Sequence, residues 1–310
     1  MSLTPTKYIW MNGKLVPWKK ATVHVLTHTL HYGMGVFEGI RCYRTPKGPA
    51  VFRLKEHVKR LENSAKLVGM KIPYSEENII SAIKNTIRAN DIEECYIRPI
   101  VFYGYGVMGL NPEGAPVNFA VAVWPWGTYL GEEGLEKGVR AKISPWIRIH
   151  PKILPPHAKL VANYANSILA KVDALSSGYD EAILLNVEGY VAEGPGENLF
   201  IVKKNKLITP PTSAGALSGI TRDSVMKIAH DEKIEVMERD FKPDEIYDAD
   251  EAFFTGTAAE VTPIREVNGR KIGSGNRGPI TERIQRIFFN AVRGREKRYE
   301  RWLDYVNSLR

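Results

Sequence analysis

The sequence predicts an α+β protein of two domains, and three observations support this prediction. At 310 residues the chain is long enough for one large domain or two ordinary ones. Its first third mixes short strand patterns with helical ones. Between about Phe119 and Gly138 an alternating apolar strand gives way to a segment whose Pro and Gly residues interrupt regular structure. We therefore place a smaller N-terminal domain at residues 1–124, a linker at 125–137 and a larger C-terminal domain at 138–310.

The N-terminal third begins with a strand pattern and continues with two helical ones. Residues 8–14 form a strand that leads into Asn12-Gly13, the strongest short hairpin signal, so a second strand is expected after it. Residues 54–68 and 75–88 have the helical period, and Ser75 followed by Asn78 resembles an N-cap in its first half. The periodic apolar positions are Val58, Leu61, Ala65, Val68, Ile79, Ile83 and Ile87.

The second domain is expected to open with a lysine followed by a helix. Lys159 lies just before a helical apolar stripe that ends at Ser176-Ser177-Gly178, a plausible helix stop. Residues 182–185 are typical of a buried strand, 187–189 of a turn, and 190–193 of the return strand. The stripe consists of Val161, Tyr164, Ile168, Val172 and Leu175.

Composition excludes several classes of protein. A content of 44% hydrophobic and 25% charged residues is ordinary for a globular protein, and no apolar run approaches the roughly 18 residues that a membrane helix needs. The N-terminus lacks the features of a signal peptide, so we expect a cytoplasmic protein. Cys42 and Cys95 form no CxxC motif, and we expect both to be buried free thiols. The seven histidines are scattered and predict no metal site.

The formal net charge of +8 comes with a localised basic run. Residues 137–171 hold seven Lys or Arg and no Asp or Glu. Such a run could follow a nucleic-acid backbone, or it could attract a phosphorylated cofactor and dicarboxylate substrates. Since no nucleic-acid motif is recognisable, we favour the second interpretation. The single glutamine, Gln285, and the charge-rich helices are typical of thermophilic proteins.

Lys159 and Glu193 could together support pyridoxal phosphate chemistry. A lysine amine can hold the aldehyde of that cofactor as a Schiff base, and a carboxylate can keep its ring nitrogen protonated so that the ring acts as an electron sink. The spacing alone is weak evidence, because most lysines are solvated surface residues.

Several motifs in register give that pair its context. Downstream of the linker they are His157–Tyr164, Gly178–Ala182, Glu193–Phe200 and Leu217–Arg222, and upstream they are His31–Arg41 and Tyr96–Pro99. In order and spacing the downstream motifs resemble those of the fold-type IV pyridoxal phosphate enzymes. The upstream motifs resemble those of the branched-chain amino acid aminotransferases within that family. The resemblance extends from about Tyr8 to about Val306.

The resemblance implies a fold, an activity and an assembly. The fold is D-amino acid aminotransferase-like, with a small α/β domain and a larger pseudo-barrel domain. The activity is ping-pong transamination, in which leucine, isoleucine or valine gives its amine to pyridoxal 5'-phosphate and 2-oxoglutarate then takes it to become L-glutamate. The assembly is a homodimer or larger homo-oligomer, with residues near Tyr32 and Met108–Leu110 approaching the neighbouring active site.

The resemblance also assigns contacts with the cofactor. Lys159 is the catalytic residue and moves a proton between the substrate Cα and the cofactor C4′. Glu193 pairs with the ring nitrogen, and Tyr164 donates to the phenolic oxygen. Residues 217–222 precede a helical pattern, so free N–H groups are available there for phosphate. The remaining cofactor contacts are Arg60, Leu217, Gly219, Ile220, Thr221, Gly256 and Thr257.

One substrate pocket must accept leucine-like and glutamate-like side chains in turn. An apolar wall serves the first, and a paired cation serves the carboxylate of the second. Phe37, Tyr164 and Trp126 are candidates for the wall, and Arg98 and Tyr32 for the carboxylate. The full set of expected substrate residues is Tyr32, Phe37, Gly39, Arg41, Tyr96, Arg98, Trp126, Tyr129, Thr257, Ala258 and Ala259.

Alternatives remain at this point. D-amino acid aminotransferases, amine transaminases and aminodeoxychorismate lyases share the lysine, the acid and the phosphate elements, so only residues 37–41 and 96–98 discriminate among them. A basic nucleic-acid-binding protein on the same scaffold is the alternative from another class. Purely structural roles are open as well: core packing for Phe37 and Tyr96, a surface salt bridge for Arg60, and an ion pair beneath the sheet for Arg98.

Overall fold

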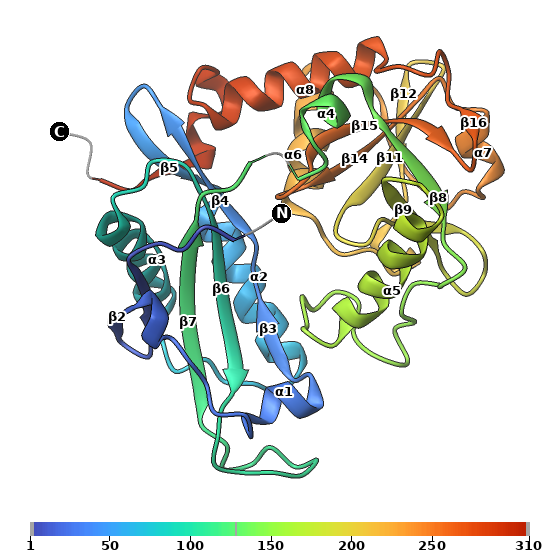
Figure 1. The fold of residues 1–310 in the computed structure, drawn as a ribbon. Helices are drawn as coiled ribbons and strands as arrows, with labels where there is room; N and C mark the ends of the chain where they lie inside the picture. The colour runs from blue at the N-terminus through green and yellow to red at the C-terminus, as the bar shows by residue number, and fades with distance from the viewer. Residues whose placement is uncertain (1–2, 128, 308–310) are drawn as a thin grey trace. The chain divides into compact units, whose positions relative to one another are not determined.

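The computed structural model describes residues 3–127 and 129–307, which form two compact units (Figure 1). The first unit comprises residues 1–126, 158–162 and 291–310, and the second comprises 127–157 and 163–290. The boundary after residue 126 lies inside the segment where we place the linker. The boundaries drawn from the sequence put 158–162 and 291–310 in the C-terminal domain, whereas their contacts group them with the first unit.

The first unit is built on an eight-stranded antiparallel sheet in the order β17-β5-β4-β6-β7-β1-β2, with β3 paired to β6. Helices α2 and α3 lie together behind the sheet in Figure 1. The strands are β1 (Tyr8–Met11), β2 (Lys14–Pro17), β3 (Gly35–Phe37), β4 (Ile40–Thr45), β5 (Gly48–Phe52), β6 (Cys95–Tyr103), β7 (Val117–Trp124) and β17 (Leu303–Tyr305). The helices are η1 (Trp18–Lys20), α1 (His28–Tyr32), α2 (Leu54–Leu67), α3 (Glu76–Asn90) and η3 (Lys297–Trp302).

The predicted elements of this unit are confirmed. β1 and β2 form a hairpin whose turn residues, Asn12 and Gly13, have φ values of 48° and 94°. Positive φ at both positions is what a two-residue turn of type I′ requires. Ser75 caps α3, because its hydroxyl accepts a hydrogen bond from the backbone N–H of Asn78 at 3.3 Å.

The second unit is built on a nine-stranded mixed sheet in the order β10-β9-β8-β15-β14-β11-β12-β13, with β16 paired to β15. Its strands are β8 (Val139–Ile143), β9 (Glu181–Leu185), β10 (Val191–Glu193), β11 (Asn198–Lys203), β12 (Lys206–Thr209), β13 (Val236–Glu238), β14 (Glu251–Gly256), β15 (Glu260–Val267) and β16 (Arg270–Lys271). Its helices are α4 (Glu132–Lys137), α5 (Asn163–Ser176), η2 (Thr212–Ala214), α6 (Ile220–Asp231), α7 (Asp244–Tyr247) and α8 (Pro279–Val292), of which α8 ends in residues of the first unit.

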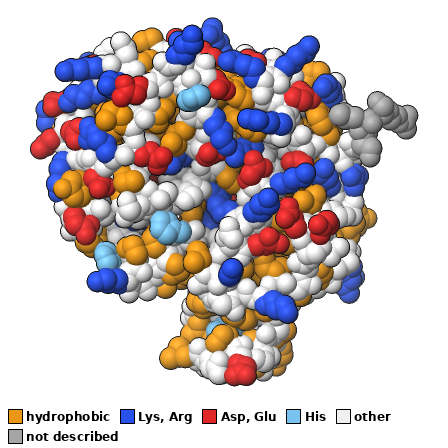
Figure 2. Space-filling view, turned by 180° about the vertical axis from the view of Figure 1, so that it is seen from behind, with side chains coloured by type: hydrophobic (Ala, Val, Ile, Leu, Met, Phe, Trp, Pro, Cys, Tyr) orange, Lys and Arg blue, Asp and Glu red, His pale blue; other side chains and the backbone are white. Residues whose placement is uncertain are grey.

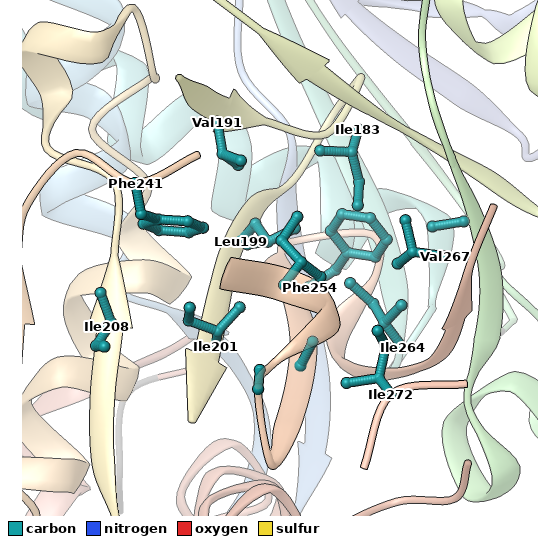
Figure 3. Close-up of a cluster of buried hydrophobic side chains, with 14 of the residues drawn as sticks. Ile183, Val191, Leu199, Ile201, Ile208, Phe241, Phe254, Ile264, Val267 and Ile272 are labelled. Atoms are coloured by element: carbon teal, nitrogen blue, oxygen red, sulfur yellow. The ribbon is translucent and has the colours of Figure 1, made fainter. Parts of the chain in front are cut away.

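Branched and aromatic side chains from several strands form one core in this unit (Figure 3). Leu199 and Ile201 of β11, Phe254 of β14 and Ile264 of β15 point toward one another there. Burial of such side chains contributes about 1.5–3 kcal/mol each to stability. The core therefore fixes the strands whose ends carry Glu193, Asn198 and Gly256.

Helix α5 forms and ends where the sequence predicts, but its apolar stripe is not the buried face. Ile168, Val172 and Leu175 are 60%, 54% and 54% exposed, whereas the buried positions include Ala170 and Ala174. Small side chains allow the helix to pack closely on the strands beside it. The helical period therefore located the helix correctly and its buried face incorrectly.

Three further findings bear on the expected class of protein. Within residues 3–127 and 129–307, no helix is long and apolar enough to cross a membrane. The same residues contain no group of three or more His, Cys, Asp or Glu able to hold a metal ion. Both cysteines are buried and free, as predicted, although Cys42 of β4 and Cys95 of β6 are direct cross-strand partners.

The basic run at 137–171 is largely compensated by acids from other segments. Arg140 pairs with Asp180, Lys142 with Asp173 and Lys171 with Glu181, at 3.3, 2.8 and 2.8 Å. On the face seen in Figure 2, basic and acidic side chains interleave. The stretch is therefore not the continuous positive surface that a nucleic-acid backbone prefers.

Candidate active site

The segment that carries Lys159 is held against β3. Val161 donates its N–H to Gly35 O at 2.8 Å, and Phe37 donates to Lys159 O at 3.1 Å. Leu160 forms a bridge with Val36, and the Lys159 N–H donates to Ser64 Oγ of α2 at 3.0 Å. These bonds fix the lysine backbone within the first unit, beside the motif that contains Phe37.

The Phe37 ring brings two cations together. Lys159 Nζ lies 5.2 Å from the ring centroid, and Arg98 Cζ lies 4.6 Å from it. Phe37 is buried, and cation–π contacts of this kind hold a guanidinium or ammonium in place. A reactive amine, an apolar ring and a guanidinium thus form one cluster, which we call the amine cluster: Lys159, Phe37 and Arg98.

Arg98 retains capacity to bind an anion. Its Nη2 donates to the Tyr96 hydroxyl at a long 3.4 Å, and its buried Nε has no hydrogen-bond partner among the residues that the structure describes. A buried donor without a partner is unfavourable until a ligand or water accepts from it. A carboxylate satisfies a guanidinium in this state.

Tyr96 is locked by aromatic neighbours and by a glycine. Its ring lies 5.2 Å from Trp124 and 5.0 Å from Trp126, and the carbonyl of Trp126 accepts from Arg41 Nη2 at 3.3 Å. A Cβ on Gly39 would lie only 2.0 Å from the Tyr96 hydroxyl oxygen. Gly39 is therefore needed so that this hydroxyl can lie over the backbone.

Arg60 has a buried partner rather than a surface one. Its Nε donates to Glu38 Oε1 at 2.7 Å and its Nη2 to Glu38 Oε2 at 2.9 Å, while Glu38 is fully buried. Burial alone would raise the pKa of Glu38, but Arg60 and His57 hold that pKa well below its usual range. The carboxylate therefore stays ionised and keeps the guanidinium in a fork.

In the second unit Glu193 is surrounded by donors. Arg148 Nη2 lies 2.8 Å from Glu193 Oε1, and Oε2 accepts from Asn198 Nδ2 at 3.1 Å and from the Leu217 N–H at 3.0 Å. Both side chains of the ion pair are almost buried. We call Glu193, Arg148 and Asn198 the carboxylate cluster.

The predicted phosphate element begins helix α6. Gly219 is its N-cap residue, and Ile220 and Thr221 in the first turn are buried. A Cβ on Gly219 would lie 1.9 Å from Asn198 Oδ1, so only glycine allows Asn198 to approach here. The first-turn N–H groups of a helix are a ready anion site. Asn198 thus connects this site to the carboxylate cluster.

Arg222, the last residue of the same motif, has a structural role. It donates to Pro210 O and Glu238 Oε2 at 2.9 and 2.7 Å. These contacts connect α6 to the strands beside it. This arginine is buried and was not among the residues expected to bind the cofactor.

A turn at residues 257–259 follows β14 as predicted. A Cβ on Gly256 would lie 3.2 Å from Gly196 O, so the turn packs against the loop that follows Glu193. Nearby Glu197 is buried, and burial together with the charge of Glu181 raises its pKa to about 8. Ala259 O accepts from Thr262 Oγ1 at 2.6 Å, which fixes the end of the turn.

The structure does not bring three of the predicted residues into these clusters. Tyr32, in α1, is 37% exposed, and its ring contacts His28 at 4.6 Å between centroids. Tyr129 lies in the second unit, with Lys171 Nζ 5.3 Å from its ring centroid. Tyr164 is the second residue of α5 and is half-buried. Their assigned contacts remain predictions.

Comparison with known proteins gives this geometry a family. Residues 35–267 match the family described as amino-transferase class IV. The branched-chain-amino-acid aminotransferase of Pseudomonas aeruginosa is 51% identical over 298 residues, which cover 96% of this chain and 97% of the relative.

Solved structures agree with the relatives. The Escherichia coli branched-chain amino acid aminotransferase has a TM-score of 0.96 and 47% identity and covers 98% of this chain and 100% of its own. The T.th. branched-chain amino acid aminotransferase complexed with N-(5'-phosphopyridoxyl)-L-glutamate has a TM-score of 0.94 and 48% identity, with 98% and 99% covered.

The chain belongs to the class IV aminotransferases. It is therefore an enzyme, and the α+β fold of type IV inferred from its motifs is confirmed. Within the family, these relatives confirm the resemblance to the branched-chain amino acid aminotransferases.

Some residues of the two clusters were not found from the sequence. Arg148 and Glu38 carry no signal of their own: the first lies in the basic run and the second inside a motif that was quoted for its neighbours. Asn198 directly follows Glu197 in another quoted motif. Its Gly219 contact becomes visible only when the fold brings the two loops together.

Proposed function

We propose that this enzyme transfers the amino group of L-leucine, L-isoleucine or L-valine to 2-oxoglutarate, giving branched 2-oxo acids and L-glutamate. The observation that carries the proposal is the amine cluster, in which Phe37 lies between Lys159 and Arg98. An apolar ring suits a branched side chain, and a guanidinium with an unsatisfied buried N–H suits the second carboxylate of glutamate.

The cofactor is pyridoxal 5'-phosphate, and residues of this chain fit it. Bound there, it supplies the aldehyde that takes up the amino group and a ring that withdraws electrons from the substrate Cα. Thr221 and the first-turn N–H groups of α6 suit its phosphate. Glu193 suits a protonated ring nitrogen, because three donors already keep its oxygens in a fixed orientation.

Lys159 is the residue that we propose to move the proton. Its Nζ would first hold the aldehyde carbon, and after the substrate amine displaces it, Nζ would take the proton from Cα and deliver it to C4′. The bonds to Gly35 and Ser64 fix the lysine backbone, so the side chain moves about a stationary anchor.

We propose the remaining contacts as follows. Tyr164 donates to the phenolic oxygen, Leu217 packs on the ring, and Arg60, Ile220, Gly256 and Thr257 contribute to the phosphate site. Thr257, Ala258 and Ala259 present the turn after β14 to the substrate α-carboxylate. Gly39, Arg41, Tyr96 and Trp126 shape the side-chain pocket around Arg98, and Tyr32 and Tyr129 complete it.

Replacing Arg98 by Met tests how the two substrates are distinguished. Met keeps the length and apolar character of the side chain but cannot bind a carboxylate. We expect kcat/KM for 2-oxoglutarate to fall about 100-fold, since a charge-assisted pair in a buried site is lost. The L-leucine half-reaction should change less than about fivefold. Both are measured by single-turnover absorbance of the bound cofactor.

Arg44→Met is the matched control, because Arg44 pairs with Glu93 at the surface. An equal loss for both substrates in Arg98→Met would contradict separate recognition. Preferential reaction with D-alanine or a simple amine would favour the D-amino acid or amine transaminases of the same fold.

We also propose that the enzyme works as a homodimer or a larger homo-oligomer. The exposed apolar face of α5 supports this, because exposed apolar patches mark interaction sites. A second set, near the segment expected to approach a neighbouring active site, includes Leu30, Met108 and Leu110. The face of α5 comprises Ile168, Leu169, Val172 and Leu175.

A cytoplasmic location is proposed on the state of the thiols. Cys42 and Cys95 remain free although their strands place them opposite each other, as expected in a reducing compartment.

A thermophilic source is proposed on charge patterning. Exposed ion pairs such as Lys227–Asp223 at 2.7 Å and Arg283 with Glu232 accompany the single glutamine. Such pairs stabilise proteins more effectively at high temperature.

A further inference from the structure

The buried carboxylate of Glu38 has four donors around it, all within the first unit. Besides the two bonds from Arg60, it accepts from His57 Nδ1 at 2.8 Å and from the Gly39 N–H at 3.3 Å, both at Oε2. Its own backbone N–H donates to Pro99 O at 2.9 Å. A buried carboxylate with this many donors is fixed in position.

The fork geometry defines which edge of Arg60 is occupied. Glu38 takes Nε and one hydrogen of Nη2, the side edge of the guanidinium. The end edge, formed by Nη1 and the second hydrogen of Nη2, is not used by Glu38. An arginine binds an anion in bidentate fashion through such an edge, and its strength depends on how well the plane is oriented.

His57 completes the arrangement as a neutral donor. Because a carboxylate can only accept, His57 must carry its proton on Nδ1. Burial lowers the pKa of His57, and the charges of Arg60 and Lys159 lower it further against the opposing effect of Glu38. His57 is 1% exposed and therefore cannot turn its ring into solvent.

We propose that Glu38 and His57 are positioning residues that orient Arg60 for the cofactor phosphate, with His57 holding Glu38 and Glu38 holding the guanidinium. This inference rests on the phosphate role proposed for Arg60. Glu38 acts through geometry and not through its charge, since a negative charge beside Arg60 by itself opposes anion binding.

The test compares the affinity of the full-length apoenzyme for pyridoxal 5'-phosphate with its affinity for pyridoxal, by absorbance titration. Both aldehydes combine with Lys159 in the same way, so the ratio of the two Kd values isolates the phosphate. Arg60→Met is expected to lower this phosphate selectivity about 100-fold. Glu38→Asp keeps the charge but withdraws the carboxylate by one methylene, and we expect a loss of about tenfold with the Kd for pyridoxal unchanged.

Two further pairs of variants separate positioning from charge and from folding. Glu38→Gln should also lose selectivity, whereas it would gain selectivity if Glu38 only weakened the Arg60 charge. His57→Leu should lose about fivefold, and His57→Asn should restore most of it, because an Asn amide can donate from nearly the place of Nδ1.

The outcomes distinguish the two proposals. If Arg60→Met leaves the selectivity unchanged, the phosphate role of Arg60 is wrong. If Arg60→Met lowers selectivity while Glu38→Asp and His57→Leu do not, Arg60 binds phosphate without help and the positioning role is wrong. Equal losses for pyridoxal and its phosphate in the Glu38 and His57 variants would likewise overturn it, since they would report a general defect of the unit.

Discussion

Replacing Lys159 by Ala is expected to lower the rate of transamination by at least about 10⁴-fold. The substitution removes both the amine that would hold the cofactor aldehyde and the base that would move the Cα proton, and a positioned acid–base group alone contributes about 10²–10⁴-fold. The rate is measured as the single-turnover conversion of L-leucine by enzyme loaded with pyridoxal 5'-phosphate. The fold should be unaffected, because the Lys159 backbone, not its side chain, makes the bonds to Phe37 and Ser64.

Lys152→Ala is the matched control for this variant. Lys152 lies in the same basic run, but its side chain is exposed. It should retain wild-type turnover. Turnover within tenfold of wild type in Lys159→Ala, with thermal unfolding unchanged, would remove Lys159 from its catalytic role.

Replacing Glu193 by Gln is expected to reduce turnover about 10²–10³-fold while leaving the cofactor bound. Gln has nearly the same shape but no charge, so a protonated ring nitrogen loses its counter-ion at the moment when the ring must withdraw electrons. Removal of one preorganised electrostatic partner from an enclosed site has a cost of this size. The measurement is single-turnover rate with L-leucine, beside a titration of cofactor Kd.

Stability must be followed in this variant, because Glu193 is also the partner of buried Arg148. Breaking a buried ion pair costs about 3–5 kcal/mol. Arg148→Met with Glu193→Gln removes both charges and serves as the stability control. Glu188→Gln, at an exposed position five residues earlier, should change nothing. A Glu193→Gln enzyme with wild-type turnover would show that the ring nitrogen does not depend on this carboxylate.

Local elements were predictable because their signals are local. The Asn12-Gly13 turn requires positive φ at two adjacent residues, and this pair of residue types adopts it readily. The helix at 54–67 follows from its 3.6-residue apolar period. In α5 the same period was misleading, because the face that packs consists of small side chains such as Ala170 and Ala174.

Long-range pairing could not be predicted from such signals. Nothing near Leu160 indicates that it pairs with Val36, more than a hundred residues earlier, or that 291–310 belong with the first unit. The sequence does not specify which distant segments the sheet brings together. The position of the domain break was accessible because Pro and Gly mark it locally.

The candidate site was predictable to the extent that motifs carry it. Lys159, Phe37 and Arg98 come from three separate motifs, and the structure brings them together. Arg148 and Glu38 were missed because their roles consist of what they hold, namely Glu193 and Arg60. Such supporting residues have no pattern of their own and become recognisable only through distances.

The most direct test of the proposed function is the absorption spectrum of the purified enzyme with bound pyridoxal 5'-phosphate during the two half-reactions. L-Leucine should bleach the visible band of the cofactor, and 2-oxoglutarate should then restore it with formation of L-glutamate. Bleaching by D-alanine or a simple amine but not by L-leucine, or failure of 2-oxoglutarate to restore the band, would contradict transamination between branched-chain amino acids and 2-oxoglutarate.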